Sequence, residues 1–341
     1  MVNVVGPIAG FLTRRSSRWS SVLVVIGTGA VLLGAIEGAS YGQNQLHARG
    51  AGAPVARSVP SCFGAASRDP LIPCRNAHLK RAVVPTPSVA QITPNAPCTP
   101  GARVGLLHPC AFGVPEDKAT ATFAALGDSH EEHFRAALQV LADAKGWLGL
   151  SIAQTGCPFS RAIKQIPLPS RLECVRWNQE LVDWFRVHPE VSTVFVAQKT
   201  SSRHVIGPAG RSAFDAKVNG YVRAWNTLPP SVSHIVVIRD TPEIAPTTLA
   251  CVTHAIRKGI AAGPACAVSR RWALRRDPAA VAAERLGSPR VRLVDLSQFI
   301  CGRRLCYPVV GGALVYKDTH HLTQVFAATL GPFILRQIDG I

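Results

Sequence analysis

The sequence predicts an α/β protein: a three-layer α/β/α sandwich with a central parallel sheet of about five strands in a flavodoxin-like arrangement, preceded by one N-terminal transmembrane helix. Three features of the 341 residues carry this prediction. From residue 119 onward, short and nearly continuous apolar runs alternate with longer amphipathic stretches, the pattern of a parallel sheet covered by helices on both faces. A separate apolar run follows three arginines near the start of the chain, and ten cysteines agree with export.

The N-terminal apolar run covers residues 21–36 and follows a basic segment, residues 1–20, that is predicted to stay in the cytoplasm. The run is shorter than the roughly 20 residues of an ordinary spanning helix, so it is either a membrane anchor or a cleaved export signal. We favour the anchor, because residues 38–40 meet the small-x-small rule for cleavage only loosely. The expected product is a single-pass protein of the cell membrane whose catalytic domain is extracytoplasmic.

The net charge of +17 favours acidic partners, among them anionic lipid headgroups, envelope polymers and nucleic acid. The arginines are scattered, and no zinc-finger, helix-turn-helix or RNA-binding motif is present, so nucleic acid is not expected as a partner.

The cysteines are even in number, and those that are neighbours in the sequence would close short loops if they were paired. This pattern is typical of disulfide-bonded proteins and therefore indicates an oxidising compartment. Connectivity does not follow from a sequence, so five sequential disulfides are a hypothesis. A structural zinc site is disfavoured because no two cysteines have the C-x₂-C spacing. The hypothetical pairs are Cys62 with Cys74, Cys98 with Cys110, Cys157 with Cys174, Cys251 with Cys266, and Cys301 with Cys306.

Residues 37–118 are rich in Gly, Pro, Ala and Ser, and they are predicted to form a linker and a disulfide-stapled lead-in to a catalytic domain at 119–341. In such sheets the functional residues lie on loops after the carboxyl ends of the strands. The apolar runs predict strands at 121–126, 147–153, 193–198, 234–240 and 291–296. The intervening stretches predict helices at about 131–145, 173–187, 212–227, 268–286 and 322–338.

The segment ATFAALGDSHEEHF, residues 121–134, places Ser129 at the turn between the first predicted strand and the next helix. The first N–H groups of that helix and the positive end of its dipole suit an oxyanion that develops on an acyl carbonyl. Gly127 allows a sharp turn, and Asp128 can bond to the loop backbone. Ser129 is therefore a candidate nucleophile. The alternative is that Asp128 or Ser129 is an ordinary helix N-cap.

A nucleophilic serine needs a base, and the segment YKDTHHLT, residues 316–323, supplies a candidate. Asp318 stands three residues before His321, a spacing at which the carboxylate can accept the second imidazole N–H and favour the imidazolium. His320 is adjacent but wrongly spaced for this role. The alternative is an aspartate at a helix start beside two surface histidines.

Together these two segments resemble the SGNH hydrolase-like superfamily. More closely, the chain resembles the extracytoplasmic SGNH domain that is often fused behind the membrane-embedded acyltransferase-3 domain of bacterial cell-surface O-acyltransferases. The resemblance covers about residues 60–338 and includes SCFGAASRDPLIPC, CPF, RDTPEIAP and CGRRLCYPVVGG. It implies that Ser129 is the nucleophile, His321 the general base and Asp318 the acid that orients it, without a cofactor.

The oxyanion donors depart from the pattern of the superfamily, which uses a glycine after the second strand and an asparagine in a G-x-N-D block after the third. Here Gly156 follows the second predicted strand, but the third runs into VFVAQKTSSR without an asparagine. The resemblance implies the amides of Ser129 and Gly156 as donors, and either the Gln198 side chain is a third donor or that donor is missing. A missing donor typically costs about 10²- to 10³-fold in rate, which disfavours vigorous hydrolysis more than transfer to a well-placed acceptor.

Three other patterns are given a structural interpretation. The histidines of HEEH, His130 and His133, are spaced i and i+3, whereas metalloprotease helices use i and i+4, so no metal is expected. Asp240 also ends a predicted strand, but Pro242 follows, and we interpret this aspartate as the start of a loop. The basic stretch at 269–276 is interpreted as a solvated helix face, with a polyanionic glycan site as the alternative.

The expected function is transfer of an acyl group, with acetyl favoured, from Ser129 to a hydroxyl of a cell-envelope polysaccharide or glycolipid. Because the 341 residues contain one candidate anchor and no multi-helix donor domain, the acyl group is expected from a separate membrane acyltransferase-3 protein or a soluble donor. One alternative is a carbohydrate O-acetylesterase that uses water. An alternative of another class is an anchored glycan-binding module with a vestigial triad.

Overall fold

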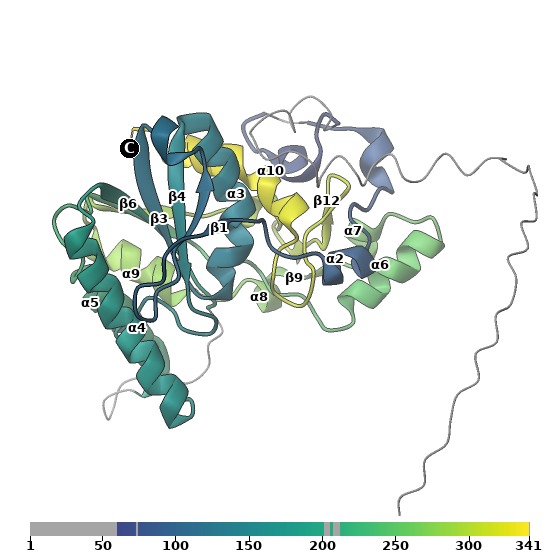
Figure 1. Cartoon of the computed structure of the whole chain (residues 1–341). Coiled ribbons are helices and arrows are strands. Elements are labelled where there is room, and N and C mark those ends of the chain that lie inside the picture. Colours follow the sequence, from purple (N-terminus) through teal and green to yellow (C-terminus); the bar gives the residue numbers. More distant parts are fainter. Residues whose placement is uncertain (1–59, 73, 201–204, 207–211, 341) are drawn as a thin grey trace, which may run out of the picture. The chain divides into compact units, whose positions relative to one another are not determined.

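The computed structural model describes residues 60–340 except for 73, 201–204 and 207–211 (Figure 1). The predicted basic segment 1–20 and the predicted anchor or signal at 21–36 lie outside the described residues. Within the described part of the chain, no helix combines the length and the apolar character that a bilayer span requires.

The central sheet contains seven strands in the order β1-β2-β4-β3-β6-β8-β10. Its five parallel strands coincide closely with the five predicted runs. They are β3 (Ala121–Gly127), β4 (Trp147–Ala153), β6 (Val191–Ala197), β8 (His234–Ile238) and β10 (Val291–Val294). Two short strands extend the sheet beyond this prediction, because β2 (Cys110–Gly113) pairs antiparallel with β4, and β1 (Thr99–Pro100) pairs with β2.

The order of the parallel strands reverses at β3, because β4 lies on one side of it and β6 on the other. Doubly wound sheets bind ligands outside the carboxyl ends of the strands at such a switch point. The register aligns Gly127 with both Ala153 and Ala197, so the three strands end level. Residues that follow these strands therefore share one edge of the sheet.

Helices cover both faces of the sheet (Figure 1). One face carries α3 (Ser129–Lys145) and α10 (Gln324–Gln337), and the other carries α4 (Leu168–Val187), α5 (Ala213–Trp225) and α9 (Pro278–Leu286). The side chains of β3 alternate accordingly: Phe123 packs in the α3 layer, and Ala124 packs in the α4 layer. This arrangement is the three-layer sandwich that the sequence predicts.

The prediction of one helix over residues 268–286 was wrong, because the chain breaks into α8 (Arg270–Ala273) and α9. The break has a local cause. The Asp277 carboxylate caps α9 by accepting the Ala279 N–H at 2.7 Å, and Pro278 occupies the first turn.

The remaining elements are short and lie in loops around the sheet. The helices are η1 (Gly64–Arg68), η2 (Ala77–Lys80), α2 (Pro87–Ile92), η3 (Glu116–Lys118), α6 (Thr248–Arg257), α7 (Ala262–Ala265) and η4 (Ser297–Phe299). The strands are β5 (Ile163–Lys164), β7 (Val205–Ile206), β9 (Val268–Ser269), β11 (Leu305–Cys306), β12 (Val309–Val310) and β13 (Ala313–Leu314).

All five predicted disulfides are confirmed. The structure joins Cys62 to Cys74, Cys98 to Cys110, Cys157 to Cys174, Cys251 to Cys266, and Cys301 to Cys306.

Candidate active site

Ser129 is the first residue of α3, immediately after the turn that ends β3. This turn requires Gly127, since its φ is +154° and a Cβ atom there would lie 1.8 Å from the carbonyl oxygen of Ala197. The N-cap of the helix is Asp128, whose carboxylate accepts the His130 N–H at 3.0 Å and the Lys199 N–H at 3.1 Å. Asp128 thus holds the loops after β3 and β6 together and leaves the Ser129 hydroxyl to another partner.

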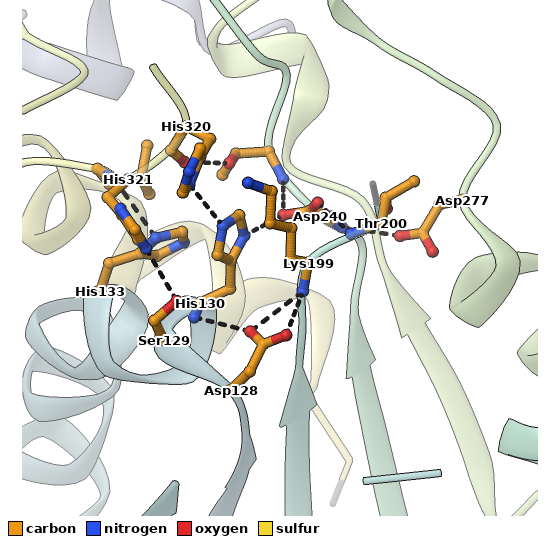
Figure 2. Close-up of polar contacts among 12 residues, drawn as sticks. Asp128, Ser129, His130, His133, Lys199, Thr200, Asp240, Asp277, His320 and His321 are labelled. Carbon is orange, nitrogen blue, oxygen red and sulfur yellow. Dashed lines mark hydrogen bonds and ion pairs between the residues drawn. The ribbon is translucent and has the colours of Figure 1, made fainter. Parts of the chain in front are cut away.

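That partner is His321, which lies between Ser129 and Asp318. The Ser129 Oγ is 2.9 Å from His321 Nε2 (Figure 2). On the other side of the ring, His321 Nδ1 is 2.6 Å from Asp318 Oδ2. With Nδ1–H donated to the carboxylate, Nε2 presents a lone pair to the serine hydroxyl. The structure therefore brings the three predicted residues into one hydrogen-bonded series, although Ser129 and His321 are 192 positions apart.

The charge of Asp318 suits its position in this series. Partial burial alone would raise the pKa of Asp318, but hydrogen bonds from the His321 ring and from the backbone N–H groups of His320 and His321 lower it far below the usual range. The carboxylate is consequently ionised and can stabilise an imidazolium at His321.

The turn that carries His321 is fixed at several points. The Lys317 N–H donates to the carbonyl of His321 at 2.9 Å, and the Thr323 side chain caps α10 by accepting the Phe326 N–H at 3.1 Å. The buried His133 of α3 approaches the next residue, with its Nδ1 3.4 Å from the Leu322 nitrogen. Helix α10 packs directly on α3, so His321 is placed by the same helix layer as Ser129.

A second polar series lies beside the first and was missed by the sequence analysis. Asp240 Oδ1 is 2.5 Å from His130 Nδ1, and His130 Nε2 is 3.1 Å from His320 Nδ1 (Figure 2). The interpretation of Asp240 as the start of a loop is incomplete, since its buried carboxylate also accepts the Thr200 N–H at 2.6 Å. Its position after β8, at the functional edge, was the available signal.

The three histidines around His321 differ in charge because their surroundings differ. Burial would lower the pKa of His130, but the charge and hydrogen bond of Asp240 raise it above the usual value. Burial and the neighbouring cationic groups lower the pKa of His320 to about 4. Complete burial and the neighbouring histidines lower the pKa of His133 well below its usual value, so this ring is neutral.

The predicted oxyanion donors have different accessibilities. Gly156 lies in a turn with φ +71°, and this turn is attached to the loop before Ser129 by a 3.0 Å hydrogen bond from the Gln154 N–H to the Gly127 carbonyl. The Gln198 side chain is enclosed, and its amide atoms have no partner among the described residues. As it stands, Gln198 does not face open space. The Lys199 side chain, which the sequence analysis did not consider, extends toward the histidines (Figure 2).

Three ring nitrogens could also meet a transition metal. One nitrogen each of His130, His320 and His321 lies within 4.8 Å of the others. In the structure, however, His130 and His320 are hydrogen-bonded to each other and His321 to Ser129, so a metal ion would have to replace these contacts. The arrangement fits acid–base chemistry directly.

One family model matches most of the chain. A family model described as "SGNH domain (fused to AT3 domains)" matches residues 97–336, which include all six residues of the two hydrogen-bonded series. No curated protein matches the chain. Among solved structures, the periplasmic domain of the lipopolysaccharide acetyltransferase of Salmonella ser. Paratyphi A is similar, with a TM-score of 0.48 and 12% identity over 66% of this chain and 90% of that one.

Proposed function

The chain belongs to the family of SGNH domains that are fused to AT3 domains, and from this premise we propose that it transfers an acyl group, with acetyl favoured, through Ser129 to a hydroxyl of a cell-envelope glycan. The observation that carries the proposal is the series from Asp318 through His321 to Ser129, with distances of 2.6 and 2.9 Å. Such a series activates a serine for covalent catalysis.

In the first half of the reaction, His321 Nε2 takes the proton of Ser129 as the Oγ atom attacks the acyl carbonyl. Asp318 stabilises the imidazolium through the hydrogen bond at Nδ1. The amide of Ser129, at the N-terminus of α3, and the amide of Gly156 are proposed to bind the oxyanion. The bond from the acyl carbon to the donor oxygen then breaks, and the donor leaves with a proton. In the second half, the acceptor oxygen bonds to the acyl carbon and gives up its proton, the bond to Ser129 Oγ breaks, and Ser129 recovers its proton from His321.

The enclosed position of Gln198 favours transfer over hydrolysis. With two oxyanion donors in place of three, attack by unbound water is expected to be slow, whereas a bound glycan hydroxyl gains from its fixed position. A carbohydrate O-acetylesterase that uses the same three residues is the alternative. The complete hydrogen-bonded series opposes a glycan-binding module with a vestigial triad.

The proposed setting is extracytoplasmic, in agreement with the family and with five disulfides. A separate membrane acyltransferase-3 protein is the proposed acyl donor. The net charge of +17 suits an anionic envelope polymer as the acceptor.

The proposal is tested with the purified full chain and its Ser129→Ala variant, using a chromogenic acetyl ester with and without candidate glycans. Turnover by the variant should fall by at least about 10³-fold. Ser170→Ala, at an exposed position of α4, is the matched control. Acetylated glycan as the product supports transfer, and turnover indifferent to glycan indicates the esterase. Equal turnover by the wild type and the Ser129 variant would disprove the serine mechanism.

A further inference from the structure

We propose that Asp240, His130 and His320 form a second proton relay, which protonates the departing acyl donor and deprotonates the arriving acceptor, while His321 exchanges protons with Ser129 alone. This inference rests on the proposed acyl transfer through Ser129. It assigns a chemical role to the second hydrogen-bonded series, which has no part in the activation of Ser129 by His321 and Asp318.

The geometry has the two ends that a relay needs. At the closed end, the His130 ring is 1% exposed and its Nδ1 is 2.5 Å from Asp240 Oδ1. At the other end, His320 is half-buried, and its Nε2 has no hydrogen-bond partner in the described part of the chain and is not among the enclosed polar atoms there. The rings of His320 and His321 are 4.1 Å apart between centroids, so the open end lies beside the triad.

The surroundings of the two rings determine which of them is protonated in the resting state. The Asp240 carboxylate faces His130 from the loop after β8, and Asp128 adds a second negative charge nearby. Burial and the charge of Lys199 act in the opposite direction, but the carboxylates raise the pKa of His130 and favour its imidazolium form. His320 does not keep a positive charge, because burial and the charges of His321, Lys199 and His130 disfavour it. In the resting state, His130 Nε2–H therefore donates to His320 Nδ1, and His320 presents Nε2–H to the site.

The protons balance in both half-reactions. During acylation, Ser129 Oγ bonds to the acyl carbon and its proton moves to His321 Nε2. The bond from the acyl carbon to the donor oxygen breaks, and that oxygen takes the proton of His320 Nε2, while His130 Nε2 passes its proton to His320 Nδ1. During transfer, the acceptor oxygen bonds to the acyl carbon and the bond to Ser129 breaks. The acceptor proton enters at His320 Nε2, the Nδ1 proton returns to His130, and His321 returns its proton to Ser129.

This division of work keeps a single positive charge in the cluster. The His130 and His321 rings lie 5.1 Å apart between centroids, where two imidazolium ions would repel strongly in a partly buried site. If only His321 accepted a proton, it would become charged beside the charged His130. Because His130 loses a proton through His320 to the leaving group, it becomes neutral as His321 is protonated, and the repulsion does not arise.

The leaving group of the ester distinguishes the relay from a structural role. The nitrophenolate of p-nitrophenyl acetate departs without a proton, whereas the alkoxide of ethyl acetate requires one. Acylation of Ser129 is measured by rapid quench and mass spectrometry for the wild type, His320→Gln and the matched control His254→Gln, at an exposed position of α6. We expect His320→Gln to slow acylation by ethyl acetate by about 10²- to 10⁴-fold, to change acylation by p-nitrophenyl acetate little, and the control to change neither.

Equal loss of acylation with both esters would overturn the relay, because it would show that His320 only supports the geometry of His321. Unchanged acylation with both esters would overturn it as well. Asp240→Asn keeps the shape of the carboxylate and should reproduce the dependence on the leaving group, whereas an equal effect of that variant on both esters would contradict the role of His130. If the proposed function itself is wrong, the Ser129→Ala variant will show normal turnover, and this outcome is distinct from those that overturn the relay.

Discussion

Gly127 positions Ser129, the proposed nucleophile, and Gly127→Ala should therefore reduce both stability and turnover. The added Cβ would lie 1.8 Å from the Ala197 carbonyl oxygen, so strands β3 and β6 must separate at the switch point. We expect a loss of a few kcal/mol in the free energy of unfolding, measured by urea denaturation, and a lower kcat.

Gly259→Ala is the control for this prediction, because Gly259 has φ +64° but, apart from its chain neighbours, no atom of the structurally described residues would lie within 4 Å of the added Cβ. That variant should lose only about 1–2 kcal/mol, the cost of the left-handed backbone for alanine. Equal stability losses in the two variants would contradict the argument from the close contact with Ala197.

Asp318→Asn should lower kcat by about 10⁴-fold while the protein stays folded, because the amide stabilises the wrong tautomer of His321 and cannot stabilise its cation. The measurement is steady-state turnover of an acetyl ester, with circular dichroism to confirm the fold. Asp143→Asn, at an exposed position near the end of α3, is the control. If Asp318→Asn keeps most of its kcat, Asp318 does not orient the base.

The sequence was sufficient to predict that Ser129, His321 and Asp318 lie together, because two short motifs carry this arrangement, and the hydrogen bonds confirm the proximity. The pairing of His130 with Asp240 was not predictable in the same way. These residues are 110 positions apart, and the pattern of strands shows that both lie at one edge but not which side chains meet. The spacing of His130 and His133 suggested a comparison with metal sites, whereas contacts across the fold determine what each ring binds.

At the scale of elements, the first turn of α3 carries a buried acid that should make stability depend on pH. Burial raises the pKa of Glu131 to about 8, and among the described residues only its Oε2 atom has a hydrogen-bond partner, the Ser151 hydroxyl at 2.9 Å. Between the ordinary value of 4.5 and about 8, the folded state keeps a proton that the unfolded state has lost. The free energy of unfolding therefore falls as pH rises through this interval.

Glu131→Gln removes this dependence and should stabilise the protein more at pH 8 than at pH 5, by an amount on the order of a few kcal/mol. The melting temperatures of the variant and the wild type, compared at both pH values, test the prediction. A difference in melting temperature that does not change with pH would show that Glu131 is not the titrating group.

Elements were predictable where one pattern determined them. The five parallel strands have continuous apolar runs because helices cover both faces, and their bounds agree closely with the prediction. Strands β1 and β2 have no such run, because they are short and depend on pairing with β4 and on the bond from Cys98 to Cys110. The break between α8 and α9 was present in the sequence as Asp277-Pro278, which the amphipathic period obscured.

At the scale of the whole molecule, the disulfides differ in what they hold, although their loops are of similar length. The bond between Cys157 and Cys174 closes 17 residues and attaches the turn of Gly156 to α4, on the face opposite α3. The bond between Cys251 and Cys266 closes 15 residues and joins α6 to the end of α7, in a hydrophobic cluster separate from those on the two faces of the sheet. Loop-closure entropy predicts nearly equal contributions of the two bonds to stability, about 3 kcal/mol each.

Their effects on catalysis should differ, because only the first bond restrains a proposed oxyanion donor. The double variant Cys157→Ser/Cys174→Ser should lose about 10²- to 10³-fold in kcat under conditions where it remains folded, comparable to the loss of one donor. Cys251→Ser/Cys266→Ser should lose similar stability but keep its kcat. Turnover and urea denaturation of both variants separate the two quantities. If both variants lose kcat equally, turnover depends on overall stability, and the Gly156 amide does not bind the oxyanion.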